Sequence, residues 1–214
     1  MPLRLGPVKF PWGEKKSHED DPYWDFFINA PAADLANTVI QMIRNAPEGN
    51  VFPKKAELHT PEITSTHVKG MAQYFGAELV GIAKLDGVAS RPLQPEADPP
   101  RAVAAEGQKE DPENALPFAV ICAVHADYDP RTAPGIGGQV PVQNGLFITF
   151  VLSAWIRELG YRATIMRNAD ADALAAKAGL GTLNSRGRLV TRQFGTGVFV
   201  ADAIYTDLPL AADG

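Results

Sequence analysis

The sequence predicts an α/β domain of helices and strands, preceded by an irregular N-terminal arm. A helical pattern over 61–75 is followed, after a short turn, by an apolar strand over 77–83. A second apolar strand is expected over 118–124, and a helix over 140–159 leads into a third strand over 161–166. Helices that alternate with short apolar strands indicate packed layers of both kinds. The 214 residues, 45% of them hydrophobic, are enough for one domain with a substantial core.

The arm, residues 1–57, differs from the expected body, residues 58–214, because its aromatic side chains follow no regular period. Proline, glycine and acidic residues alternate with the aromatic anchors Trp12, Tyr23, Trp24, Phe26 and Phe27. We expect this arm to pack on the body or on a partner subunit. Within it, 33–44 is predicted to form a short helix, because its apolar residues fall on one face.

Capping signals bound two of the helices. Thr60 is expected to cap the first helix, Pro61 suits its first position, and Gly76 ends it. Asn168 or Asp170 is expected to cap a later helix that ends near 178. The last two strands are predicted over 188–191 and 197–205.

Two segments are predicted to lack regular structure. Residues 86–115 contain five prolines, so we expect a long surface loop, either disordered or acting as a lid. Gly135, Gly137 and Gly138 come directly before the helix over 140–159. They form either a flexible loop or a set of backbone amides that hold an anion such as phosphate. No P-loop lysine follows them, so nucleotide hydrolysis is not expected.

Charge and cysteine content exclude several classes of function. A formal net charge of −5 gives no general attraction to nucleic acid. The single cysteine, Cys122, excludes an internal disulfide and a four-thiolate iron–sulfur or zinc site. Its apolar neighbours predict a buried strand residue rather than a reactive thiol. The four histidines show no metal-ligand spacing, so no metal site is expected.

The apolar segments predict neither export nor a membrane span. The N-terminus has no apolar run suited to a signal peptide. The most apolar stretch, about 146–156, is shorter than a bilayer-spanning helix. We therefore expect a cytoplasmic protein that does not bind membranes.

Two groups of residues are candidates for a functional site. Gly179-Leu180-Gly181 and Gly187 follow the helix that begins near 170. They are either a helix C-cap with a tight turn or a backbone shelf against a flat cofactor. The order of helix, glycines and strand excludes a dinucleotide-binding fingerprint. The second group is His125, the best acid–base candidate at a strand end, with Tyr128 nearby.

Three stretches, in order, resemble the reductive dehalogenase and epoxyqueuosine reductase group over roughly 58–210. They are 77–83, then 155–163, then the run from Ala178-Gly179-Leu180-Gly181 through 189–195 to Thr206-Asp207-Leu208-Pro209-Leu210. The resemblance implies a nitroreductase-related α+β sandwich, a central sheet flanked by helices, that holds cobalamin flat against loops and backbone. In that family the cobalt of the corrinoid reduces the substrate.

The same resemblance implies site residues and departures from the family. Val142 lies close to the position at which family members carry a tyrosine proton donor, and Phe199 lies close to the position of an arginine that assists the reaction in some of them. The usual dehalogenation route is therefore not expected. His125, Tyr128 and Asn168 are the catalytic candidates. The implied cofactor contacts are Asn168, Gly179, Leu180, Gly181, Gly187, Leu189, Thr191, Phe194 and Gly195.

Family members draw electrons from two four-iron clusters in a ferredoxin-like module whose cysteines follow the TDLPL stretch. The sequence here ends at Gly214, so we expect a cobalamin-binding protein without its own clusters, supplied by a separate electron-donor protein. One alternative is a flavin-dependent reductase that holds flavin mononucleotide at a homodimer interface, with its phosphate met by arginines between Arg162 and Arg192. The other is a non-catalytic binding or assembly protein that kept only the fold.

Overall fold

The computed structural model describes residues 39–85, 116–125, 136–167 and 169–214. The aromatic anchors of the arm, the loop 86–115, Tyr128 and Asn168 lie outside these residues. In chain order the elements are α2 Val39–Asn45, α3 Pro61–Tyr74, β1 Leu79–Lys84, β2 Phe118–His125, α4 Ile136–Glu158, β3 Ala163–Met166, α5 Ala171–Lys177, β4 Thr182–Leu183, β5 Leu189–Val190, β6 Val198–Val200 and β7 Ala203–Thr206.

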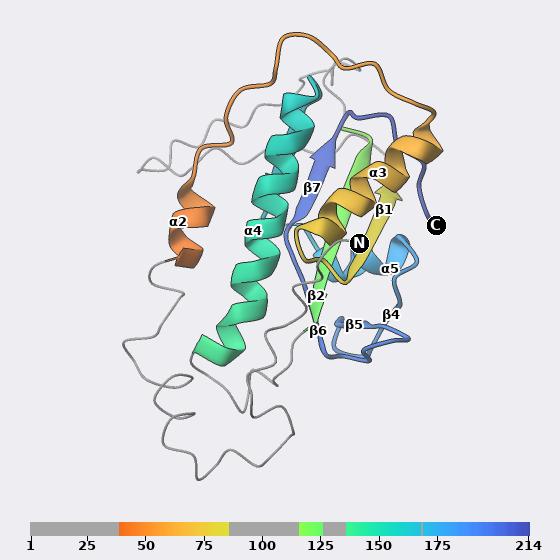
Figure 1. Cartoon of the computed structure of the whole chain (residues 1–214). Coiled ribbons are helices and arrows are strands. Elements are labelled where there is room, and N and C mark those ends of the chain that lie inside the picture. Colours follow the sequence, from red (N-terminus) through yellow and green to blue (C-terminus); the bar gives the residue numbers. More distant parts are fainter. Residues whose placement is uncertain (1–38, 86–115, 126–135, 168) are drawn as a thin grey trace, which may run out of the picture.

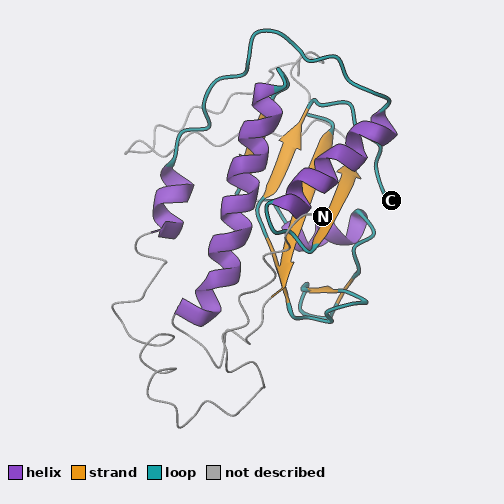
Figure 2. Cartoon of the chain, in the orientation of Figure 1, coloured by secondary structure: helices purple, strands orange, loops and turns teal. Residues whose placement is uncertain are grey.

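The central sheet is antiparallel and lies between two layers of helices (Figures 1 and 2). Its strand order is β1-β2-β7-β3, and β6 also pairs with β2. Helices α3 and α4 cover one face, and α5 covers the other. The predicted α+β sandwich is confirmed, whereas its relationship to nitroreductases stays a prediction.

The strands have two buried faces because their residues alternate between two cores. In β2, Val120, Cys122 and Val124 face the core shared with α3 and α4. Ala119, Ile121 and Ala123 face the core shared with α5. Cys122 is fully buried, as its apolar neighbours predicted, and burial raises the pKa of its thiol to about 12. A thiol in this state is not a nucleophile at neutral pH.

Helix α3 begins and ends where its sequence signals predicted. Pro61 occupies the first turn after Thr60, although the Thr60 side chain makes no capping hydrogen bond. The helix stops before Gly76, whose φ of 109° is in the region that favours glycine. Asp170, one of the two predicted caps, accepts a hydrogen bond from Ala173 N at the start of α5.

Helix α4 is longer than the sequence indicated. It begins at Ile136, so Gly137 and Gly138 lie in its first turn rather than in a preceding loop, and Pro141 lies inside it. The prediction placed the boundary at Val140 because glycine and proline usually punctuate helices. By length and composition Gln139–Glu158 could span a membrane, but the same pattern is found in core helices, and several of its residues are buried in the core.

The predicted strand 197–205 is interrupted. Ala201 and Asp202 separate β6 from β7, and both strands pair with β2, at Ala123–His125 and Phe118–Val120 respectively. Ala201 N still donates to Cys122 O at 2.9 Å, and residues 201–203 stand opposite only 121 and 122, so one extra residue is accommodated as in a bulge. The two-residue strand β4 was missed by the sequence analysis, because such a short strand has no period to detect.

Side chains from the neighbouring segments close the β3 edge of the sheet. The buried Arg157 of α4 donates from Nη1 to Ala163 O at 2.8 Å, and Glu48 Oε1 accepts from Ile165 N at 3.1 Å. Desolvation lowers the pKa of Arg157, and Glu48 opposes that effect by Coulomb attraction. Backbone hydrogen bonds from Phe52 and Ala56 to the last turn of α4 and Leu159 hold this part of the expected arm on the body. An edge covered in this way is protected from pairing with another chain.

Candidate functional site

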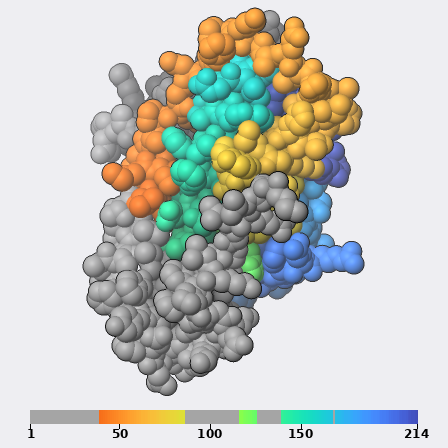
Figure 3. Space-filling model, in the orientation of Figure 1, coloured from red at the N-terminus to blue at the C-terminus, as the bar shows by residue number. Residues whose placement is uncertain are grey.

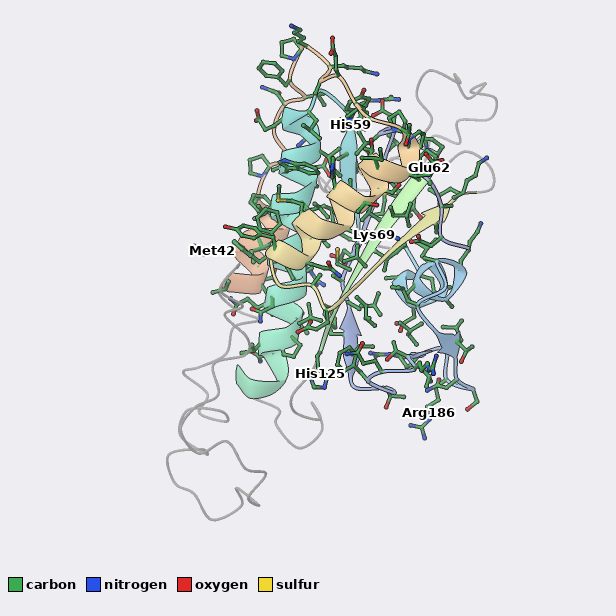
Figure 4. All side chains as sticks on the ribbon, turned by 45° about the vertical axis from the view of Figure 1, so that its right-hand side comes forward. Met42, His59, Glu62, Lys69, His125 and Arg186 are labelled. Atoms are coloured by element: carbon green, nitrogen blue, oxygen red, sulfur yellow. The ribbon has the colours of Figure 1, made fainter. Side chains whose placement is uncertain are left out.

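The candidate residues that the structure describes are one segment, residues 179–195, and His125, which contacts this segment through Phe194; together they are here called the candidate surface. It runs from the end of α5 through the β4–β5 hairpin to the loop before β6. Figure 3 shows the hairpin, in blue, projecting from the body. In Figure 4, His125 at the end of β2 and Arg186 in the hairpin turn lie toward the same end of the molecule.

Gly179 ends α5 through a Schellman motif. Its φ is 74°, Gly179 N donates to Ala176 O, and Leu180 N donates to Ala175 O, both at 3.0 Å. The interpretation of this glycine as a helix C-cap is therefore confirmed. The motif turns the chain so that Leu180 packs over Gly81 of β1, where a β-carbon would lie 2.9 Å from Leu180 Cγ.

Gly181 is a glycine because the other half of the hairpin lies against it. A β-carbon there would be 2.2 Å from Val190 O and 2.9 Å from Val190 C, both backbone atoms. Thr182 pairs with Val190 next to this contact. The missing side chain at Gly181 thus allows close approach of the protein's own hairpin, and this face of the residue is not open to a ligand.

The turn of the hairpin is held by side-chain carbonyl and carboxylate oxygens. Asn184 Oδ1 accepts from both Arg186 N and Arg188 N, and Gly187, with a φ of 72°, completes the turn. Asp172 Oδ1 of α5 accepts from Leu189 N at 2.7 Å and ties the hairpin to the helix. Neither Asp172 nor Asn184 was predicted from the sequence; an asparagine three residues before a glycine was the available signal.

The loop after the hairpin brings His125 to the candidate surface. Thr191 and Gly195 exchange backbone hydrogen bonds, and Thr191 Oγ1 accepts from Phe194 N at 3.0 Å. This tight loop places the Phe194 ring on the His125 imidazole, with centroids 4.7 Å apart and planes at 28°. The candidate acid–base residue is therefore coupled to the glycine-containing segment by direct stacking.

The candidate surface combines supporting residues with accessible ones. Leu189 and Thr191 are buried, so their side chains pack inside the protein beneath the candidate surface and are not accessible to a ligand. Leu180 and Phe194 are half-buried, and Gly179 and Gly187 are exposed. Apart from chain neighbours, no heavy atom of the described residues lies within 4 Å of a virtual β-carbon on Gly187 or Gly195. Exposed backbone and one imidazole can hold a flat, largely neutral molecule by contact and hydrogen bonds.

Other residues weighed in the sequence have structural roles. Phe199 packs its ring against α4 at Gly145, where a β-carbon would lie 2.9 Å away. Arg162 pairs with Asp207 through Nε at 2.9 Å, and Arg188 lies 3.7 Å from Asp172. These two arginines are already paired with carboxylates. Among the residues that the structure describes, no three His, Cys, Asp or Glu side chains are placed to hold a metal ion.

A second polar site lies at the interruption between β6 and β7. Asp202 Oδ2 and Arg44 Nε of α2 are both buried, and neither makes a hydrogen bond within the described part of the chain. Burial raises the pKa of Asp202, and the charges of Arg44 and Arg167 oppose that rise. The charged carboxylate is therefore disfavoured in the folded protein.

Replacing Asp202 with asparagine is expected to stabilise the protein at pH 7, because burial disfavours the charged carboxylate and the amide carries no charge. A raised pKa in the folded state favours the wild-type protein in acid, and this contribution is lost as the pH rises through that pKa. The difference between Asp202→Asn and wild type should therefore shrink towards pH 4. Urea unfolding at several pH values measures it. A variant that is less stable at pH 7 would mean that attraction to Arg44 outweighs desolvation.

Comparison with known proteins identifies the fold. No protein-family model matches the sequence, and neither does any curated protein. Among solved structures, the catabolic reductive dehalogenase NpRdhA is similar, with a TM-score of 0.60, 19% identity and 82% of this chain covered. Its complex with 3-bromo-4-hydroxybenzoic acid matches equally well. A reductive dehalogenase whose structure suggests a mechanism for B12-dependent dehalogenation gives a TM-score of 0.60 at 20% identity over 81% of this chain.

These similarities establish a reductive-dehalogenase-like fold. The matched region is 26% of each dehalogenase, so this chain corresponds to about a quarter of those proteins. The resemblance noted in the sequence is confirmed at the level of the fold, over a large part of the same residues.

Proposed function

We propose that this protein binds a cobalamin-type corrinoid and that the candidate surface provides part of the binding site. The observation that carries the proposal is the fold, which is similar to that of B12-dependent reductive dehalogenases. The exposed backbone at Gly179 and Gly187 and the stacked His125–Phe194 pair supply contacts suited to a flat macrocycle with amide side chains. Corrinoid chemistry would provide the reducing centre, and these residues would bind and orient it.

The roles of individual residues follow from their positions. Leu180 and Phe194 would contact the apolar part of the macrocycle, while Leu189 and Thr191 hold the backbone beneath them. His125 is the acid–base candidate within this surface, and its ring orientation is fixed by Phe194. Tyr128 and Asn168 stay candidates from the sequence alone.

The proposal includes an external source of electrons. The 214 residues contain one cysteine, Cys122, which is fully buried, so they cannot ligate a four-iron cluster through four thiolates. We propose that a separate redox protein in the cytoplasm reduces the corrinoid. A flavin cofactor at a homodimer interface is less well supported, because Arg162 and Arg188 already have carboxylate partners.

Equilibrium dialysis against hydroxocobalamin and flavin mononucleotide tests the proposal. We expect hydroxocobalamin to be retained with a dissociation constant on the order of 1 μM and flavin not to be retained. Retention of flavin alone would favour the flavin-dependent reductase. Retention of neither would favour a binding or assembly protein that kept only the fold.

A further inference from the structure

The last four residues connect both helical layers to the edge of the sheet. Ala211–Gly214, here called the C-terminal strap, lies along β1, the edge strand opposite β3 (Figure 1). It follows Leu208 and Leu210, which are buried in the core with α3 and α4. The strap is thus held at its start by apolar burial.

On one side the strap is bonded to α3. Ala211 N donates to Ser65 Oγ at 2.8 Å, and this buried hydroxyl donates to Ala211 O at 3.3 Å. One turn further along α3, Lys69 forms an ion pair with the Asp213 carboxylate. Figure 4 labels Lys69 on this helix.

In the middle, Asp213 pairs with β1 as a strand would. Asp213 N donates to Ile82 O at 2.9 Å, and Ile82 N donates to Asp213 Oδ2 at 2.8 Å. The side-chain oxygen replaces the backbone carbonyl that a neighbouring strand would offer. This is the same solution as at the other edge, where Glu48 accepts from Ile165 N.

On the other side the strap reaches the end of α5. A β-carbon on Gly214 would lie 2.1 Å from Lys177 O and 3.8 Å from Gly179 N, and Asp213 O lies 3.9 Å from a virtual β-carbon on Gly179. Ala178 and Leu180 contact β1 at Gly81, directly before Ile82. The strap and the first glycine of the candidate surface therefore meet at the same point of β1.

We propose that Asp213 is a positioning residue that, with Lys69, fixes the Gly179–Gly181 segment against β1 and thereby sets the affinity of the candidate surface for its cofactor. This inference rests on the proposed corrinoid function for its ligand. The structural connection between Ile82, the strap and Gly179 does not depend on the identity of the ligand.

The test replaces Asp213 with alanine and with asparagine. Alanine removes the acceptor for Ile82 N and the partner of Lys69, whereas asparagine can keep one carbonyl oxygen for Ile82 N but replaces the oxygen that pairs with Lys69 by an NH2 group. We expect Asp213→Ala to weaken hydroxocobalamin binding about tenfold and Asp213→Asn to recover only the part of that loss that depends on the acceptor for Ile82 N. Glu57→Ala, which removes an exposed carboxylate elsewhere on this acidic chain, is the matched control and should bind as wild type does.

Amide hydrogen exchange supplies the second measurement. In Asp213→Ala, the amides of Ile82 and of Gly179–Gly181 should lose protection together, while the amides of β7 keep theirs. Loss of protection at Ile82 alone would overturn the coupling. So would unchanged cobalamin affinity in Asp213→Ala, if the wild-type protein binds. Absence of binding by the wild-type protein would instead refute the corrinoid function, and exchange would still decide the geometric coupling.

Discussion

Replacing Gly181 with alanine is expected to destabilise the protein by about 2–3 kcal/mol and to remove measurable corrinoid binding. The new β-carbon would meet the backbone carbonyl of Val190 at 2.2 Å, and backbone atoms cannot rotate away as a flexible side chain can. The hairpin must then separate, and the pairs Thr182–Val190 and Leu183–Leu189 are lost. Chemical unfolding and a cobalamin titration measure the two effects.

Gly187→Ala is the matched control for this prediction. Gly187 also belongs to the hairpin and has a φ of 72°, but beyond its chain neighbours no heavy atom of the part of the chain that the structure describes lies within 4 Å of its virtual β-carbon. Only the conformational penalty of about 1 kcal/mol is expected there. Equal effects of the two substitutions would contradict the close approach of Gly181 to Val190.

Replacing Ile204 with alanine is expected to destabilise the protein by about 3–4 kcal/mol, within the usual range for a large residue in a packed core. Ile204 lies in β7, is fully buried, and stands opposite both Val120 of β2 and Ile165 of β3. Its removal leaves a cavity at the centre of the sheet, between the strands and the α3–α4 layer. Urea unfolding measures the change in free energy.

The same substitution at Ile63 provides the comparison. Ile63 lies on α3 and is 45% exposed, so Ile63→Ala should change stability by less than about 0.5 kcal/mol. A loss at Ile204 no larger than that at Ile63 would contradict the assignment of β7 to the middle of the sheet.

Local signals in the sequence predicted those helices and strands whose position is decided by residues close together in the chain. Thr60, Pro61 and Gly76 located α3, and the apolar neighbours of Cys122 located β2 with its buried thiol. In each case the deciding interactions lie within a few residues of chain, or depend on the overall balance of apolar side chains.

The errors and omissions come from contacts between distant parts of the chain. Nothing near Gly181 in the sequence reveals Val190 O, and nothing near Asp213 reveals Ile82. The strand over 197–205 was predicted as continuous, although a one-residue shift of register at Ala201 and Asp202 separates its two pairings with β2. Tertiary context decides such features, and a single sequence does not contain it in readable form.

The candidate site residues stay predictions, and the structure adds the contact of Phe194 with His125. The sequence indicated Gly179, Gly187 and Phe194 as candidates. It did not show that Leu189 and Thr191 are buried, or that Asp172 and Asn184 build the support. A pattern of glycines indicates freedom of the backbone, but it does not distinguish space for a ligand from space for the protein's own chain.

A visible-absorbance titration of hydroxocobalamin with the purified protein tests the central claim most directly. We predict a shift of the cobalamin spectrum that saturates at one equivalent of protein, because the environment of the corrinoid changes on binding. The Gly181→Ala variant should give no shift at the same concentrations. A spectrum that stays unchanged at saturating wild-type protein, with no calorimetric heat of binding, would contradict the account.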